Sequence, residues 1–457
     1  MSKNITKDMT SGSPMRLILE FALPLLLGTL FHQVYNLVDT MIVGKTLGVD
    51  ALAAVGATGS VMFLILGFCM GLCAGFALPI AREFGAKNYE NLKKYAGNAI
   101  TLAALTAIVM TSLTLCLCHH IILWMNTPSN IEDMSYQYLL IIFAGIPTSM
   151  AYNLLSGFLR SLGDSRRPLY FLIISSALNI VLDLVFILCF HMGVSGAATA
   201  TVLSQLVSAL LCLIYIRRRV ELLHISGNDL KPETAYVKDL FAMGFPMGFQ
   251  YSITAIGSVI LQTAINGLGS VAVASVTAAS KIDMFGQCPF GALGNAMATY
   301  AGQNVGAVKY DRVKKGLYNA CLLGSVYSLL LLLIILPFGK AFFLLFMDAS
   351  ETVVISQGYQ CIVTYVCFYV PLAILNIVRF TIQGMGYSGL AVFAGLAEMI
   401  ARSLVALVFV PLYGFTAACF AGPLAWLFAD AFLIPAFYYC LGKLKKAAGA
   451  DSLYIVH

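Results

Sequence analysis

The chain has 457 residues, of which 60% are hydrophobic and 11% are charged, and its formal net charge is +6. Soluble proteins carry about 45–50% apolar and about 25% charged residues. This composition therefore excludes a soluble enzyme, a disordered chain and a conventional nucleic-acid-binding protein. The mean hydropathy is +0.87. About 20 apolar residues span a bilayer, and the sequence therefore predicts an all-α polytopic protein surrounded by the lipid bilayer.

Twelve apolar runs follow one another along the chain, each long enough for a membrane-spanning helix. We expect these spans near residues 16–43, 52–80, 95–118, 135–157, 169–190, 194–216, 239–265, 271–300, 316–346, 356–380, 390–412 and 415–441. Lys and Arg cluster in alternate connections: 81–94 holds four of them, whereas 119–134 holds none. The positive-inside rule then predicts a multi-pass protein of the plasma (cytoplasmic) membrane with both termini in the cytoplasm.

The two halves of the chain resemble each other. The segment 85–99 aligns with 306–320, and Gly, Ala, Tyr, both Lys, Asn and Ala recur in place. Because each half holds six spans, an even number, the two repeats run parallel, and a substrate path is expected between them. We predict two pseudo-symmetric six-helix lobes, at 1–216 and 239–457, joined by a cytoplasmic linker at 217–238.

Ionisable side chains inside apolar spans cost free energy and commonly mark a transport pathway. In the first lobe, Asp39, Asp183 and Thr201 lie at similar depth on three spans, and Asn179 shares the helix face of Asp183. Their oxygens suit a proton or a small metal cation such as Na⁺, and two nearby carboxyl groups favour proton exchange. The alternative is a hydrogen-bonded knot that joins three helices and binds no ion.

The second lobe carries a different set of charges, namely Lys281, Asp283, Glu398, Arg402 and Asp430. Glu398 and Arg402 are four residues apart on one helix, which predicts a pair that is either structural or functional. Asp283 is followed by Met284 and Phe285, a combination of acid, soft and aromatic groups that attracts organic cations. Plain packing is the competing interpretation of these two apolar side chains.

Two other residues within spans are interpreted from their position. Pro24 bends the first span and frees a backbone carbonyl, which predicts either a hinge or a static kink before Asp39. Arg379 falls near the cytoplasmic end of its span, where its side chain is expected to snorkel to the surface. The 12 cysteines lie almost wholly in apolar runs and are interpreted as packing residues rather than disulfides or metal ligands.

The chain resembles the multidrug and toxic compound extrusion (MATE) family over nearly its whole length. The resemblance rests on the two six-span lobes, on the span from Pro24 to Asp39, and on the loop 79–86, Pro-Ile-Ala-Arg-Glu-Phe-Gly-Ala. It is similar to the prokaryotic branch with a first-lobe cation site. The site residues that the resemblance implies are Asp39, Asn179, Asp183, Thr201, a backbone carbonyl near Ala197, and Tyr138.

The resemblance also implies an activity. It predicts a monomeric antiporter, without a cofactor, that exports amphipathic, mostly cationic drugs or metabolites by alternating access. The coupling ion is H⁺ or Na⁺, and protonation bends the first span at Pro24. The acid near span 7 of other branches has no counterpart here, where Gln250 and Gln262 are the polar residues. Gln250 therefore joins Asp283, Met284 and Phe285 as an expected residue of the substrate cavity.

Two other classes of function stay open at this point. A lipid-linked saccharide flippase of the same broad superfamily often has extra spans and a strongly cationic cavity, unlike the twelve spans and the acidic first lobe found here. A membrane-embedded enzyme needs a catalytic pair such as His with Asp or Glu on facing helices. The spacing of the six His residues indicates no such pair, so no catalytic residue is expected.

Overall fold

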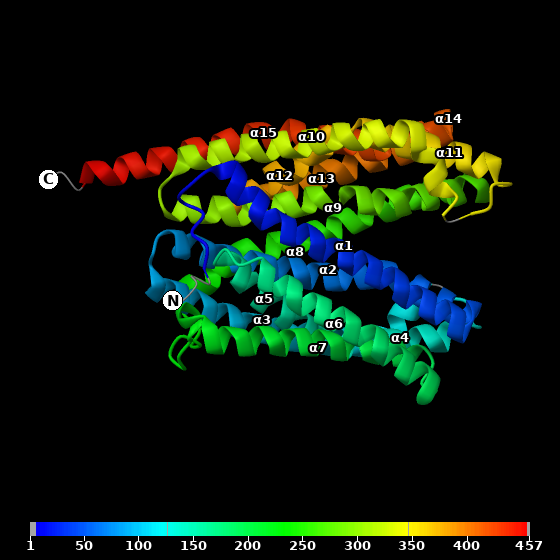
Figure 1. Ribbon diagram of the computed structural model, residues 1–457, viewed down its shortest axis with the longest axis horizontal. Coiled ribbons are helices and arrows are strands. Elements are labelled where there is room, and N and C mark those ends of the chain that lie inside the picture. The colour runs from blue at the N-terminus through cyan, green and yellow to red at the C-terminus, as the bar shows by residue number, and fades with distance from the viewer. Residues whose placement is uncertain (1–5, 126, 346, 455–457) are drawn as a thin grey trace. The chain divides into compact units, whose positions relative to one another are not determined.

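The computed structural model describes residues 6–125, 127–345 and 347–454, and within them the chain is helical and has no strand (Figure 1). It divides into two compact units. The first unit comprises Met1–Asp8 and Leu27–Ser252, and the second comprises Met9–Leu26 and Ile253–His457. Two long helices, α1 (Pro14–Leu47) and α8 (Thr234–Asn266), each contribute residues to both units.

The remaining elements follow in chain order. The first unit contains α2 Val49–Gly85, α3 Tyr89–Trp124, α4 Glu132–Ala144, α5 Ile146–Ser161, α6 Arg166–Leu184, the π-helical turn η1 Val185–Cys189, α7 Val194–Arg219 and the 3₁₀ turn η2 Glu221–Leu223. The second unit contains α9 Ser270–Gly306, α10 Tyr310–Phe343, α11 Thr352–Cys367, α12 Tyr369–Gly384, α13 Ser388–Leu404, the π-helical turn η3 Val405–Phe409, α14 Val410–Tyr413 and α15 Phe415–Tyr454.

The predicted all-α membrane fold is confirmed. Among the described residues, eight helical spans are long and apolar enough to cross a membrane. Two bent pairs, α4 with α5 (44°) and α11 with α12 (51°), raise the number to ten. Helices α8 and α9, of 33 and 37 residues, are also long enough to cross but are more polar, since α8 carries Gln250 and Gln262 and α9 carries Lys281 and Asp283. The spans predicted near 239–265 and 271–300 fall on these two helices.

The backbone reproduces the sequence repeat. Helix α2 ends at Gly85 and α3 begins at Tyr89, while α9 ends at Gly306 and α10 begins at Tyr310. Positive φ angles recur at equivalent places in the two halves, in the pairs Lys87 and Val308 (both 59°), Gly48 and Gly269 (89° and 96°), Gly163 and Gly386 (84° and 96°), and Gly193 and Gly414 (60° and 62°). The π-helical turns η1 and η3 are equivalent as well. The repeat is therefore structural and not a chance similarity of apolar helices.

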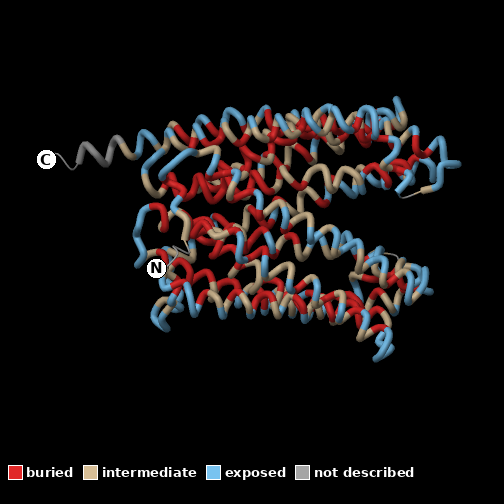
Figure 2. The backbone as a smooth tube through the Cα atoms, in the orientation of Figure 1, coloured by how far each residue is buried: buried red, intermediate tan, exposed pale blue. Residues whose placement is uncertain are grey.

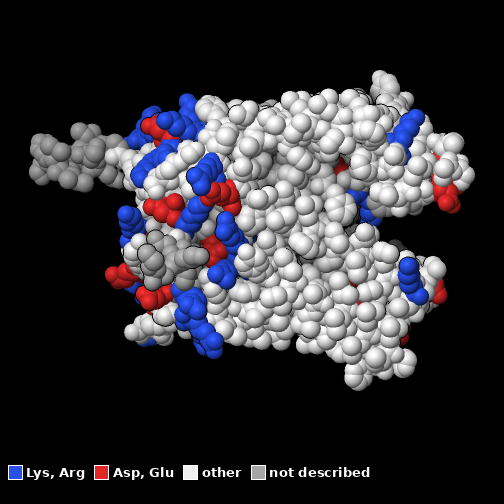
Figure 3. All heavy atoms as spheres, in the orientation of Figure 1, with Lys and Arg blue, Asp and Glu red and all other residues white. Residues whose placement is uncertain are grey.

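The surface of each unit suits a lipid environment. Buried positions run along one side of the helices and exposed positions along the other (Figure 2). Many of the exposed positions are large apolar residues, such as Leu105 (58% exposed) and Leu333 (67%). Lys and Arg gather mostly at one end of the helices, and the long middle is almost free of charge (Figure 3). Apolar outer faces with charged ends are the arrangement of a multi-pass membrane protein.

The division between the units falls inside α1 and α8 and not in the linker. The segment before α1 is bound to the second unit, where Met9 N donates to Gln303 Oε1 (2.9 Å) and Arg312 donates to Gly12 O (2.9 Å). The linker is bound to α3 of the first unit, where Glu233 N donates to Asn98 Oδ1 (2.9 Å). The predicted domain boundaries at 217–238 stay a prediction.

A close helix contact, absent from the sequence predictions, organises the first unit. Gly67, Gly71 and Gly75 form a stripe along α2 that faces α8. A Cβ atom at Gly75 would lie 2.5 Å from Gly244 Cα, and one at Gly71 would lie 2.6 Å from the carbonyl oxygen of Met247. Small residues at this spacing let two helices approach closely where lipid offers little hydrophobic driving force.

Replacing Gly75 with Leu is expected to lower the midpoint of thermal unfolding, because overpacking of this contact costs about 1–3 kcal/mol, or about 1–3 °C for a chain of this size. Circular dichroism of the detergent-solubilised protein measures the change. Gly56→Leu on the same helix is the matched control, since a Cβ atom at Gly56 meets nothing within 4 Å. Equal losses in the two variants would contradict a specific α2–α8 contact.

Candidate functional site

Two carboxyl groups meet inside the first unit. Asp39 on α1 and Asp183 on α6 are close enough to interact directly through their side chains. Asp183 is fully buried and Asp39 is half-buried. Within the described residues, Asp39 Oδ1 and both carboxyl oxygens of Asp183 receive no hydrogen bond. Two bare carboxylates repel each other strongly where water is excluded, so the contact is favourable only with a proton or a cation between them.

Polar groups of three helices surround this pair. Asn179 Nδ2 donates to Thr201 Oγ1 at 3.5 Å, which joins α6 to α7. The hydroxyl groups of Tyr35 on α1 and Thr201 are also 3.5 Å apart. Asn179 Oδ1 is buried without a hydrogen-bond partner among the described residues. The carboxyl, amide and hydroxyl oxygens together form a donor set that fits a proton or Na⁺, since hard cations prefer oxygen ligands.

The other two predicted site residues lie beside the pair. Tyr138 on α4 is 5% exposed and within electrostatic range of both Asp39 and Asp183. Ala197 on α7 is 1% exposed and belongs to the same apolar cluster as Tyr138. The structure thus brings the six predicted residues of the first lobe together, while their role as ion ligands stays a prediction. Tyr35 was missed, although its position one helical turn before Asp39 is a signal in the sequence.

Pro24 lies inside α1 and is buried. Helix α1 continues without interruption from Pro14 to Leu47, and the division between the two units falls after Leu26. The predicted hinge therefore lies two residues before the point at which α1 passes from one unit to the other. Its bending on protonation stays a prediction.

The acid predicted for the substrate cavity has partners in the second unit. Tyr369 Oη on α12 donates to Asp283 Oδ1 at 2.6 Å, and Gln287 Nε2 donates to Asp283 Oδ2 at 2.5 Å. The ring of Tyr369 lies 5.2 Å from that of Phe290 and 6.3 Å from that of Trp426. An acid among aromatic rings is a suitable surrounding for an organic cation.

Of the three residues predicted to line the substrate cavity with Asp283, two lie beside it on α9 and the third, Gln250, lies in the first unit. Met284 and Phe285 are half-buried on α9, as the sequence adjacency requires. Gln250 is 7% exposed and lies in the part of α8 that belongs to the first unit. The partners Gln287 and Tyr369 were missed: Gln287 is one turn after Asp283 and was detectable, whereas Tyr369 lies on another span and gave no local signal.

A compact set of charges is buried in the second unit. Glu398 accepts a hydrogen bond from Arg402 at 3.3 Å, so the predicted pair on α13 is confirmed. Arg379 on α12 forms a second ion pair with the same carboxylate. Arg379 is only 6% exposed, and the prediction that its side chain snorkels to the surface is wrong. Glu398 on α13 gives Arg379 an ion-pair partner inside the helix bundle, and the sequence of one span does not predict a partner on another span.

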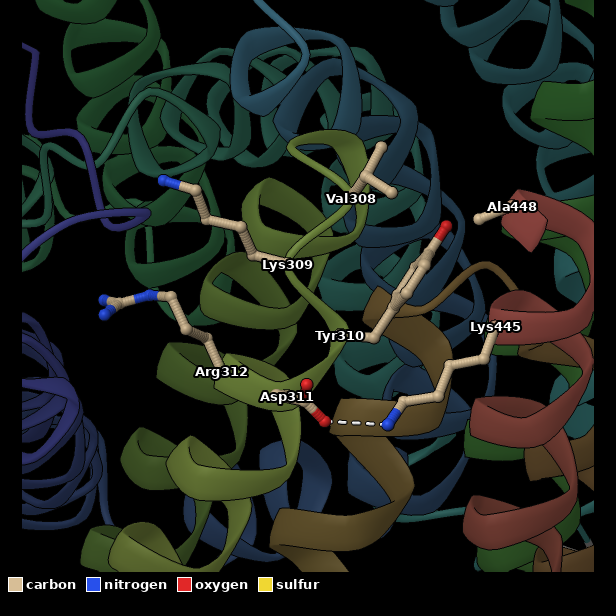
Figure 4. A pocket seen from close by; sticks show the side chains of 7 residues that line it. All are labelled: Val308, Lys309, Tyr310, Asp311, Arg312, Lys445 and Ala448. Carbon is tan, nitrogen blue, oxygen red and sulfur yellow. Dashed lines mark hydrogen bonds and ion pairs between the residues drawn. The ribbon is translucent and has the colours of Figure 1, made fainter. Parts of the chain in front are cut away.

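An open pocket lies at the charged end of the second unit. It has a volume of about 540 Å³ and is lined by residues of the α9–α10 turn and the start of α10, and by Lys445 and Ala448 of α15 (Figure 4). Asp311 and Lys445 pair across it at 2.7 Å. Lys309 and Arg312 point away from it, and they donate hydrogen bonds to Thr10 O and Gly12 O. This pocket contains none of the predicted site residues.

Comparisons with known proteins agree with these features. The family model described as MatE matches residues 24–185 and 246–409, once in each half of the chain. The chain is 31% identical over 360 residues to the probable multidrug resistance protein YoeA of Bacillus subtilis, covering 77% of this chain and 78% of the relative. It is 27% identical over 372 residues to the probable multidrug resistance protein YpnP of the same species, covering 81% and 82%.

Solved structures share the fold. An outward-facing structure of a multidrug resistance MATE family transporter of the MOP superfamily aligns with a TM-score of 0.91 and 24% identity, covering 97% of this chain and 99% of that chain. A crystal structure of MATE in complex with MaL6 aligns with a TM-score of 0.89 and 23% identity, covering 98% and 100%. With the repeated family match and the 31% identical relative, these findings show that the chain belongs to the MATE family of membrane transporters.

Proposed function

We propose that this protein is a secondary antiporter that exports amphipathic, mostly cationic drugs or metabolites in exchange for H⁺ or Na⁺. The observation that carries the proposal is the contact between Asp39 and Asp183 inside the first unit of a transporter fold, where Asp39 Oδ1 and both carboxyl oxygens of Asp183 have no donor among the described residues. The relatives support the export of drugs, since two are named probable multidrug resistance proteins and a third, from Staphylococcus aureus, is named multidrug export protein MepA.

The acid pair supplies the coupling energy in this proposal. Without a bound ion, repulsion between Asp39 and Asp183 favours a conformation in which α1 and α6 separate. A proton or Na⁺ between the carboxyl groups reverses that preference and favours the geometry described here. An ion drives a conformational change only through such a difference in affinity between two states. Asn179 and Thr201 complete the ligand set when the ion is Na⁺.

The substrate and the surroundings follow from the other features. Asp283, within its aromatic surroundings and next to Met284 and Phe285, attracts the positive end of an amphipathic cation. We place the protein in the cytoplasmic membrane with both termini in the cytoplasm, because Lys and Arg cluster in alternate connections. The protein acts as a monomer and needs no cofactor other than its coupling ion.

Replacing Asp183 with Asn is expected to stabilise the ion-free protein in alkaline, Na⁺-free buffer. The amide supplies a donor to Asp39 and removes one of two repelling charges, worth about 1–2 kcal/mol, or about 1–2 °C in the midpoint of unfolding. In acidic buffer a proton already occupies the pair, so the advantage shrinks. Thermal unfolding of both proteins in both buffers measures this, with the exposed Asp50→Asn as control. An equal shift in the two buffers would contradict the interpretation.

Transport in proteoliposomes tests the function itself. A fluorescent organic cation is expected to move against its gradient when a pH or a Na⁺ gradient is imposed separately, and the effective gradient identifies the coupling ion. Asp39→Asn and Asp183→Asn are each expected to reduce gradient-driven transport at least about tenfold, since each removes a charge on which ion binding depends.

The outcomes separate the alternatives. Transport that is unchanged in both Asn variants would reduce the acid pair to a structural contact between helices. If no organic cation moves under either gradient, a labelled lipid-linked saccharide is the next substrate to test, and its movement would indicate a flippase. The Asp50→Asn variant should retain the transport of the unmodified protein.

A further inference from the structure

The buried charges of the second unit include a member that the proposed function leaves unused. Arg379 on α12, Glu398 on α13 and Asp430 on α15 are 6%, 3% and 7% exposed. Arg379 and Glu398 are the two charges that act on Asp430. Charged side chains in a membrane span are retained at a cost in free energy, which makes an unassigned acid in such a cluster a candidate for function.

Two buried polar atoms of this cluster make no hydrogen bond within the described part of the chain. Glu398 binds Arg379 through one carboxyl oxygen and Arg402 through the other, so one negative charge faces two positive charges. Arg379 Nε has no acceptor and Asp430 Oδ1 has no donor among the described residues, although both atoms are buried. Each of these two atoms can still take a hydrogen bond, and they do not bond to each other in this conformation.

The groups around Asp430 come from several helices. Arg379 on α12 attracts its negative charge, and Glu398 on α13 repels it. Cys321 on α10 lies within electrostatic range of Asp430. On α11, Cys361 and Tyr365 interact with each other, and Tyr365 also lies within electrostatic range of Asp283. The balance at Asp430 is therefore set by Arg379 against Glu398.

We infer that Asp430 is a second proton-binding residue, and that its proton decides whether Arg379 binds only Glu398 or also binds Asp430. With the proton, Asp430 is neutral and the arrangement described here is favourable. When the proton leaves, the bare carboxylate needs a donor, and Arg379 Nε is the unused donor of the cluster. The exchange draws α12 towards α15 and involves no change in covalent bonds.

Helix α12 connects this exchange to the surroundings of Asp283. Arg379 and Tyr369 lie on the same helix, α12, which has 16 residues. Tyr369 donates the hydrogen bond to Asp283. A displacement of α12 at Arg379 therefore changes the position of Tyr369, and the proton on Asp430 alters the surroundings of Asp283. As a contribution to ion-coupled export, this step rests on the proposed function.

Infrared difference spectroscopy tests the inference without requiring transport. A protonated carboxyl group has a C=O stretching band that a carboxylate lacks. When membranes that contain the full-length protein are stepped from acidic to alkaline buffer, loss of a buried carboxyl band is expected. Asp430→Asn should abolish one component of that loss, and Asp430→Glu should restore a shifted component. Asp311→Asn, which removes an exposed acid, is the matched control and should leave the spectrum unchanged.

Each result has a defined meaning. A spectrum that is identical in Asp430→Asn and the unmodified protein, with equal thermal stability, overturns the inference. Loss of the component in Asp430→Asn, with the component due to Asp39 and Asp183 intact, supports it. A different result would contradict the proposed function, namely gradient-driven transport that is unchanged in Asp39→Asn. In transport assays, Asp430→Asn should also flatten the pH dependence of export at least about threefold, whereas Asp311→Asn should not.

Discussion

The contact between Asp39 and Asp183 is the interaction on which the chemistry of the first unit depends. Water stabilises separated carboxylates, but the interior of a helical bundle offers only the donors that its own side chains provide. Here Asn179 and Thr201 bond to each other, and among the residues that the structure describes Asp39 Oδ1 and both carboxyl oxygens of Asp183 have no donor. In the proposed function, this pair converts the concentration of a small cation into a preference between conformations, which a fully hydrogen-bonded cluster of the same residues would not do.

The two units solve the same problem of buried charge in different ways. The first unit leaves its acids unneutralised, whereas the second neutralises Glu398 with two arginines. The repeat gives both units the same backbone, down to the turns with φ of 59° at Lys87 and Val308. Equivalent helices thus carry unlike side chains, and the asymmetry of function lies in the residues placed on a symmetric scaffold.

Much of this arrangement could be predicted from the sequence, because membrane spans follow from local composition. The spans, the repeat and the grouping of Asn179 with Asp183 depend on helical spacing and depth, which one sequence contains. Contacts between spans far apart in the chain are different. Arg379 was predicted to snorkel because it falls near the cytoplasmic end of its span, and only the packing of α12 against α13 reveals Glu398 as its partner. The hydrogen bond from Tyr369 to Asp283 was missed for the same reason.

The turns that join α2 to α3 and α9 to α10 have a mechanical consequence. Val308 adopts a left-handed backbone conformation that costs a β-branched residue about 1–3 kcal/mol. Hydrogen bonds from Val308 N to Val305 O (2.9 Å) and from Lys309 N to Asn304 O (2.8 Å) hold it there, and Lys87 occupies the matching turn. A turn held in this way does not act as a flexible joint. Each turn therefore fixes the angle between its two long helices, so that a tilt of one helix is accompanied by a tilt of the other.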